Sequence, residues 1–240
     1  MQNRYTGDIG DFGKLGLLRQ LAKAGFSIGV NWYLTPDEAH NNDGCHTAYL
    51  QKKRFGICDP ALLAALNRIV SANRRTVSQL EQPEILQATF YSPVLDFTGL
   101  SKAERQCFRW EWHTQAVQRL QKCDLVFADP DNGLMVPSAA ETPKSNKYIL
   151  PFELAEYYHN GASVVYYQHK ARLPDSVYMR QNEQLVTSGA FPGAKGLGLK
   201  FKSTSLRYYF FLMQPQHEAA IQKTVSKMLE SPWSQYFMLL

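Results

Sequence analysis

Several carboxylate side chains stand in short loops that directly follow apolar segments of the sequence. After the apolar segment 28–34 come Asp37, Glu38 and Asp43, which fall within seven residues and have His40 between them. After the apolar segment 125–128 comes the run Asp-Pro-Asp-Asn-Gly, residues 129–133. Carboxylates and amides in such loops accept hydrogen bonds from a ligand or bind a hard cation such as Mg²⁺. Both runs are also good turn formers, so a role limited to the turn stays open for each.

A third polar cluster, the pair His169-Lys170, follows the apolar segment 163–168. If these segments are parallel strands, the three polar clusters converge on one edge of the sheet. Open α/β sheets bind their ligands in the crevice at that edge. We therefore expect a shared pocket at the carboxyl ends of the strands.

The N-terminal segment 4–14 is unusual because it combines three glycines with acidic residues and Lys14. A glycine-rich turn that leads into a helix can present backbone N–H groups to an anion. The segment is neither a Walker A loop nor a G-x-G-x-x-G dinucleotide motif, because Leu15 follows Lys14 and no strand precedes the glycines.

Apolar strand segments alternate with helical ones along the chain. Strands are predicted at 28–34, 88–91, 125–128 and 163–168, and an antiparallel pair at 197–202 and 206–213. Helices are predicted at 15–23, 60–71, 101–122, 151–159, 175–186 and 217–229. This order predicts a three-layer, Rossmann-like α/β fold with a mostly parallel sheet, a closing antiparallel hairpin and a small helical insertion near 45–80, in a single domain spanning 1–240.

Composition excludes several classes of protein. The chain has 240 residues, a net charge of +5, 45% hydrophobic and 20% charged residues, which is typical of a globular domain and not of a disordered, collagenous or coiled-coil chain. No apolar run approaches the roughly 18 residues of a membrane span, and no secretory signal is visible. We expect a cytoplasmic protein without a membrane partner. The oligomeric state stays open.

The chain resembles the Rossmann-like S-adenosylmethionine-dependent methyltransferases, and among them the ribosomal RNA large subunit methyltransferase J group. The segment with Tyr5, Gly7, Asp11 and Lys14 matches that group's opening segment. Asp129 and Pro130 match the first half of its Asp-Pro-Pro-Tyr motif. The resemblance implies S-adenosylmethionine as cofactor and a nucleic-acid substrate, RNA or DNA, and it requires no metal.

The resemblance also implies site residues. The catalytic set is Lys14, Asp129, Asp131 and Asn132. The cofactor-binding set is Tyr5, Gly7, Asp11, Asp37, Glu38 and Asp43. The sequence departs from the family pattern in two ways: no Asp-x-Gly-x-Gly follows the first strand, and Asp131 and Asn132 replace the second proline and the aromatic residue. The substrate therefore differs, or methyl transfer has been lost or replaced.

Two other functions stay open. The carboxylates supply hard oxygen ligands for Mg²⁺, which suits a metal-dependent phosphodiesterase or nuclease. A non-enzymatic interaction protein on a methyltransferase-like scaffold is the other alternative, because fold does not fix function. A basic face for a phosphate backbone is predicted at Lys52, Lys53, Arg54, Arg74, Arg75, Lys195, Lys200, Lys202 and Arg207, with an ordinary solvated surface as the competing interpretation.

Overall fold

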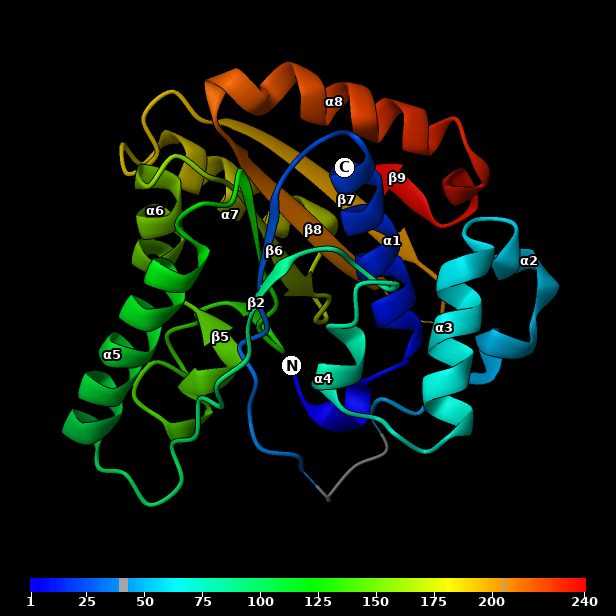
Figure 1. Ribbon diagram of the computed structural model, residues 1–240. Helices are drawn as coiled ribbons and strands as arrows, with labels where there is room; N and C mark the ends of the chain where they lie inside the picture. Colours follow the sequence, from blue (N-terminus) through cyan, green and yellow to red (C-terminus); the bar gives the residue numbers. More distant parts are fainter. Residues whose placement is uncertain (39–42, 205) are drawn as a thin grey trace.

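A seven-stranded sheet forms the centre of the molecule, with strand order β2-β1-β3-β6-β8-β7-β9 (Figure 1). The computed structural model describes residues 1–38, 43–204 and 206–240. The strands are β1 (Ile28–Asn31), β2 (Thr89–Tyr91), β3 (Leu125–Ala128), β6 (Ser163–His169), β7 (Lys195–Lys202), β8 (Leu206–Met213) and β9 (Phe237–Leu239). β2, β1, β3 and β6 pair in parallel, whereas β8 is antiparallel to β6 and β7, and β9 is antiparallel to β7. The predicted α/β fold with a closing antiparallel hairpin is confirmed.

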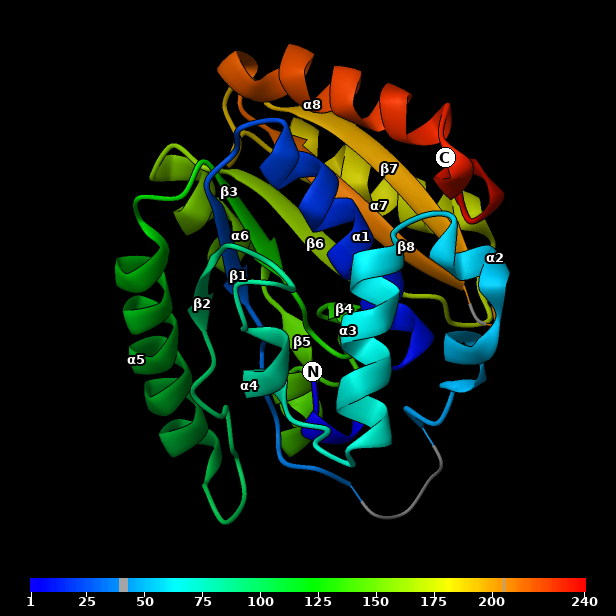
Figure 2. The same cartoon turned by 45° about the vertical axis from the view of Figure 1, so that its right-hand side comes forward.

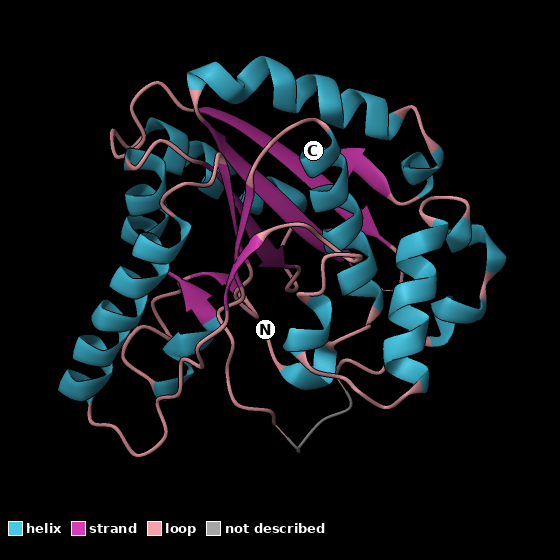
Figure 3. Cartoon of the chain, viewed as in Figure 1, coloured by secondary structure: helices cyan, strands magenta, loops and turns pink. Residues whose placement is uncertain are grey.

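Helices cover both faces of this sheet (Figure 3). One face carries α1 (Ile9–Lys23), α3 (Pro60–Ser71), α4 (Val77–Leu80) and α8 (Pro215–Leu229). The other carries α5 (Lys102–Leu120), α6 (Pro151–His159) and α7 (Asp175–Thr187). Side chains of each strand alternate between the two cores: Leu125 and Phe127 pack with α1, and Val126 and Ala128 pack with α5 and α6.

The segment between β1 and β2 is helical apart from its loops (Figure 2). It contains the 3-10 helix η2 (Ala48–Gln51), α2 (Lys53–Gly56), α3 and α4. These helices lie within the range where an insertion near 45–80 is predicted. Asp59 caps α3 by accepting a hydrogen bond from Leu62 N at 3.0 Å, with Pro60 at the first helical position.

Helix α1 begins at Ile9, six residues before the predicted start at residue 15. Three glycines and two charged residues in its first turns argue against a helix by intrinsic propensity. Tertiary packing overrides that propensity, because every residue from Ile9 to Leu18 is buried. The glycines permit close approach: a Cβ on Gly16 would lie 2.2 Å from the ring of Trp233.

The other predicted elements agree with the structure to within a few residues. The capping box at Ser101 and Glu104 opens α5 as predicted. The predicted strand 28–34 ends early, at Asn31, because Tyr33 adopts a left-handed backbone conformation with φ of 46°. Strand β9 was not predicted. Two short strands, β4 (Gly133–Leu134) and β5 (Tyr148–Ile149), form a separate small parallel sheet. The connection between them contains the 3-10 helix η3 (Pro143–Lys147).

In the described part of the chain, no helix is both long enough and apolar enough to cross a bilayer.

Candidate functional site

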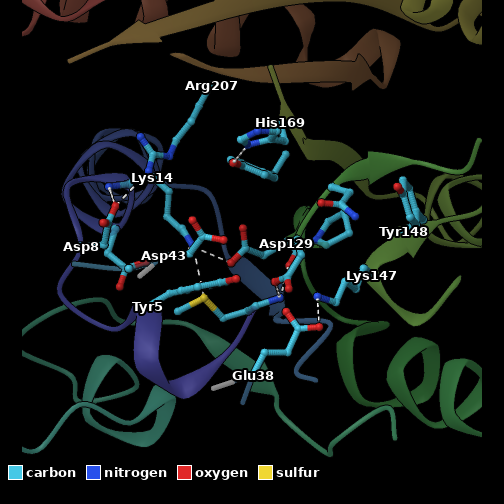
Figure 4. Close-up of a pocket in the computed structure, with 18 of the residues that line it drawn as sticks. Tyr5, Asp8, Lys14, Glu38, Asp43, Asp129, Lys147, Tyr148, His169 and Arg207 are labelled. Carbon is cyan, nitrogen blue, oxygen red and sulfur yellow. Dashed lines mark hydrogen bonds and ion pairs between the residues drawn. The ribbon is translucent and has the colours of Figure 1, made fainter. Parts of the chain in front are cut away.

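A cavity of about 560 Å³ lies at the carboxyl ends of β1, β3 and β6 (Figure 4). Glu38 and Asp43 line it from the loop after β1, Asp129 from the loop after β3, and His169 from the end of β6. The predicted convergence of the three polar clusters is confirmed. His40 lies outside the described residues. The chain runs from β1 outward to β2 and returns past β1 to β3, so the cavity stands at the point where strand order reverses, which is the usual ligand position in such sheets.

The N-terminal residue lies between the ends of β1 and β3. Its amino group donates to the carbonyl oxygens of Tyr33 at 3.0 Å and Asp129 at 3.2 Å, and its carbonyl accepts from the backbone N of Thr35 at 2.8 Å. It also forms an ion pair of 2.5 Å with Asp131 Oδ1, and Gln2 Nε2 donates to the other oxygen of that carboxylate at 2.9 Å. Asp131 therefore anchors the N-terminal segment against the loop after β3.

Lys14 and Asp129 form a buried ion pair in the centre of the cavity wall. Lys14 Nζ also lies 3.1 Å from Asp11 Oδ1, one helical turn earlier on α1. Burial alone would lower the pKa of the Lys14 ammonium, but the carboxylates of Asp129 and Asp11 outweigh burial and raise it. Burial raises the pKa of Asp11, although Lys14 and the Gly7 N–H oppose the shift. Lys14 thus stays charged although it is buried, and it joins α1 to the end of β3.

A second wall of the cavity joins the hairpin to the first turn of α1. Arg207 Nη2 on β8 donates to Asp8 Oδ1 at 2.9 Å, and Asp8 also caps α1 through Gly10 N at 2.8 Å. The predicted anion-binding amides of this turn are therefore partly used by the chain itself. His169 lies nearby, its Nδ1 3.4 Å from the hydroxyl of Tyr167. Burial, followed by the charge of Arg207, lowers the pKa of His169, so the imidazole is neutral at pH 7.

The opposite wall comes from η3 and β5, which contribute Lys144, Lys147 and Tyr148. Lys147 Nζ forms an ion pair of 2.6 Å with Glu38 Oε1, and this pair joins η3 to the loop after β1 (Figure 4). Lys144 is exposed, and Tyr148 is half-buried. The two walls differ in that α1 and β8 are long elements, whereas η3 is a short helix in a long connection.

A buried network behind this wall holds η3 and β5 in place. Arg109 on α5 donates to the carbonyl oxygens of Ser145 at 2.8 Å and Tyr148 at 2.6 Å. Its Nε and Nη2 also donate to the two oxygens of Glu153 at 2.7 and 2.8 Å. Glu153 Oε2 in turn accepts from Tyr33 Oη at 3.2 Å. The network therefore connects both loops that border the cavity.

The structure brings most of the predicted site residues together around the cavity. Those that line it are Tyr5, Asp11, Lys14, Glu38, Asp43, Asp129, Asp131 and Asn132. Gly7 and Asp37 do not line it: the Gly7 N–H donates to Asp11 Oδ2, and the exposed Asp37 accepts from the backbone N of Arg4. Among the aromatic residues in and near these loops, Tyr5 lines the cavity, whereas Phe12, Trp32 and Tyr33 are fully buried in the cores.

Sequence reasoning did not assign several residues that line the cavity. These are Met1, Asp8, His46, Lys144, Lys147, Tyr148 and Tyr167. Arg207 was assigned to the basic face, yet it lines the cavity and pairs with Asp8. Arg75 donates to the Thr6 and Gly44 carbonyls, and Lys200 pairs with Asp175. The basic face as predicted is therefore reduced to its exposed members, which are Lys52, Lys53, Arg54, Arg74, Lys195 and Lys202.

The cavity carboxylates pair with cations, and this limits what they offer a metal. Among residues 1–38, 43–204 and 206–240, no three His, Cys, Asp or Glu side chains are arranged to hold a metal ion. A magnesium ion at Asp131 would have to displace the N-terminal ammonium and the Gln2 amide, and at Asp129 it would lie close to the Lys14 ammonium.

Comparison with known proteins adds little to this description. No family model matches the chain, and no curated protein matches it. Among solved structures, the chain is similar to the crystal structure of protein LPL1258 from Legionella pneumophila str. Philadelphia 1, which carries the family model DUF519. The sequence identity is 10% and the TM-score 0.42, with 98% of this chain and 96% of that chain covered.

Proposed function

We propose that the protein is an S-adenosylmethionine-dependent methyltransferase that acts on nucleic acid. The observation that carries the proposal is the buried pair of Lys14 and Asp129 in a cavity at the reversal of strand order. Both residues belong to the catalytic set that the family resemblance implies. They lie 115 positions apart in the sequence, so their meeting is not a consequence of local structure.

The residues around the cavity fit such a cofactor. Its volume lies in the range of small-molecule sites, which is roughly 300–1,000 Å³. Its walls carry both carboxylates and cations, and a zwitterionic amino-acid group with an adjacent sulfonium needs both kinds of partner. Lys14 would hold a carboxylate, and Asp11 would hold an ammonium group. When bound, S-adenosylmethionine supplies an electrophilic methyl group.

The protein's own part in transfer would be to orient a nucleophile. Lys14 is the one donor to the Asp129 side chain among the described residues, so that carboxylate keeps acceptor capacity toward the cavity. It would accept a hydrogen bond from an amino group of the substrate, with Pro130 beside it. Tyr5 lines the same cavity, and burial together with Asp131 raises its pKa, so its ring is neutral and suited to stack on a base.

Calorimetric titration tests the proposal directly. Heat on adding S-adenosylmethionine to the wild type, together with transfer of a labelled methyl group to RNA or DNA, is the expected result. Loss of transfer in Asp129→Asn would support the role of that carboxylate. Binding heat with Mg²⁺ alone would favour the phosphodiesterase alternative. No binding heat with either ligand would favour the interaction protein.

A further inference from the structure

The side chain of Glu38 lies in a setting that resembles an anion-binding site. Its Oε1 is 2.6 Å from Lys147 Nζ, and its Oε2 is 3.7 Å from Arg4 Nη2 and 3.4 Å from Gln2 Nε2. The backbone N of Glu38 donates to Gln2 Oε1 at 3.2 Å, which fixes the carboxylate beside these groups. Two cations and one amide donor from separate parts of the chain thus converge on one carboxylate.

Two cationic side chains, Lys147 and Arg4, contact the Glu38 carboxylate, and the exposed Lys144 lines the same cavity. The neighbouring Asp131 accepts from Gln2 Nε2 at 2.9 Å and is itself paired with the N-terminal ammonium. The side chains of Lys147 and Arg4 are 17% and 16% exposed, so their charges are only partly screened by water. A phosphate group carries the same charge as Glu38 and offers more acceptor oxygens to the same donors.

We propose that Lys147, Arg4 and Gln2 form a phosphate subsite that Glu38 occupies in the ligand-free protein, and that a phosphodiester of a polynucleotide substrate replaces the Glu38 carboxylate there. The subsite deepens the proposed function, on which it rests, by naming where the backbone next to the target nucleotide binds. Tyr148 lies beside Lys147 on the cavity wall and offers a ring to a neighbouring base.

Competition with Glu38 explains why a polynucleotide is favoured over a free nucleotide. The carboxylate is tethered to the site and therefore competes at a high effective concentration. A free phosphate or mononucleotide must displace it with a single contact. A polynucleotide that also contacts the cavity elsewhere brings its phosphodiester at a comparable effective concentration, so the exchange becomes favourable.

Fluorescence anisotropy tests the subsite by measuring the affinity for a labelled single-stranded oligoribonucleotide over a range of salt concentrations. Removing the competitor in Glu38→Gln should tighten binding by about three- to tenfold. Lys147→Gln should weaken binding by about tenfold and reduce the slope of log K against log salt by about 1. Lys147→Arg retains the charge and should restore binding, which separates loss of the contact from misfolding.

The chain offers a matched control in the exposed pair Lys102–Glu141, which is 2.5 Å long and does not line the cavity. Glu141→Gln and Lys102→Gln change the net charge by the same amount as the two test variants. Affinity within about twofold of wild type is expected for both. Equal tightening in Glu38→Gln and Glu141→Gln, or equal weakening in the two lysine variants, would overturn the subsite.

Two further measurements separate the possible failures. In the first, adenosine monophosphate and inorganic phosphate serve as competitors. Displacement of the oligonucleotide by either competitor, at a concentration equal to that of the oligonucleotide, would overturn the assignment to a polynucleotide. Titration with S-adenosylmethionine tests the parent proposal alone. Oligonucleotide binding with the expected variant pattern, but without cofactor heat, would keep the subsite and reject methyl transfer. Binding heat with S-adenosylmethionine, but no change of oligonucleotide affinity in either variant, would reject the subsite and keep the methyltransferase proposal.

Discussion

Two of the buried ion pairs that join distant segments, Arg109–Glu153 and Lys14–Asp129, differ in how fully their carboxylates are used. Glu153 accepts from Arg109 Nε and Nη2, from Tyr33 Oη and from Leu150 N, the last at 2.9 Å. Among the described residues, the Asp129 side chain accepts from Lys14 alone. Both carboxylates are almost inaccessible to solvent, but only Asp129 lines the large cavity.

This difference separates a structural ion pair from one that is able to bind a ligand. Four donors surround Glu153, so it holds the loop after β1 and the η3–β5 segment together with little capacity for another partner. Burial alone would raise the pKa of Glu153, but Arg109 outweighs burial and lowers it. Asp129 has unused acceptor positions that face the cavity. A bidentate guanidinium suits the first role, and a compact ammonium suits the second.

The largest effect is expected on breaking the saturated pair. Glu153→Gln leaves the buried Arg109 guanidinium without its counter-charge and should reduce the free energy of unfolding by about 3–5 kcal/mol. Urea denaturation followed by circular dichroism measures this loss. A loss below about 1 kcal/mol would mean that the network does not hold the two cavity loops together.

A smaller effect on stability, but a large one on function, is expected at the unsaturated pair. Asp129→Asn keeps an acceptor oxygen and leaves Lys14 paired with Asp11, so the free energy of unfolding should fall by about 1–2 kcal/mol. Methyl transfer should fall by about 100-fold, because an amide holds an attacking amine less strongly than a carboxylate does. Equal losses of stability in Asp129→Asn and Glu153→Gln would remove the distinction between the two pairs.

The smallest effect concerns pH and the buried His113, which packs beside the Glu153 network. Burial lowers the pKa of His113 in the folded protein, although Glu153 and Glu156 oppose the shift. The unfolded chain therefore binds a proton more readily, near its ordinary pKa of about 6.5, and stability should fall as pH drops from about 7 to 5. His169 has the same direction of shift and adds to the fall.

Unfolding free energies measured at pH 7, 6 and 5 test this dependence. His113→Gln should remove about half of the decrease, because it deletes one of the two histidines with a lowered pKa. A pH dependence unchanged in His113→Gln would show that His113 is not buried in its neutral form. Glu153 contributes in a separate window, since its lowered pKa lets stability decline only below about pH 4.3.

Local sequence signals predicted the elements whose ends are marked by capping residues. Asp59 with Pro60 and Ser101 with Glu104 located the starts of α3 and α5, and alternating apolar segments located the central strands. The convergence of loops at one edge followed from parallel strands. The first two turns of α1 were missed because their burial depends on contacts with Phe201 and Trp233, near the other end of the chain.

The wall of the cavity formed by η3 and β5 had no detectable sequence signal. Lys144, Lys147 and Tyr148 lie on a short 3-10 helix and a two-residue strand, and neither is long enough to produce a periodic pattern. Their position depends on Arg109, which contacts backbone carbonyls there and therefore leaves no pattern of residue types. Arg207 was placed on the surface because its partner, Asp8, lies 199 positions away.

The contact between Asp8 and Arg207 has a consequence for when the site forms in a newly made chain. Residues that complete the cavity lie at both ends of the sequence, and α1 is packed against Trp233 as well as against the hairpin. Until β7, β8 and the segment around Trp233 have left the ribosome, the apolar helix α1 lacks the neighbours against which it packs in the folded protein. Such high contact order slows folding and leaves apolar surface exposed during synthesis. The cavity is therefore completed only at the end of folding.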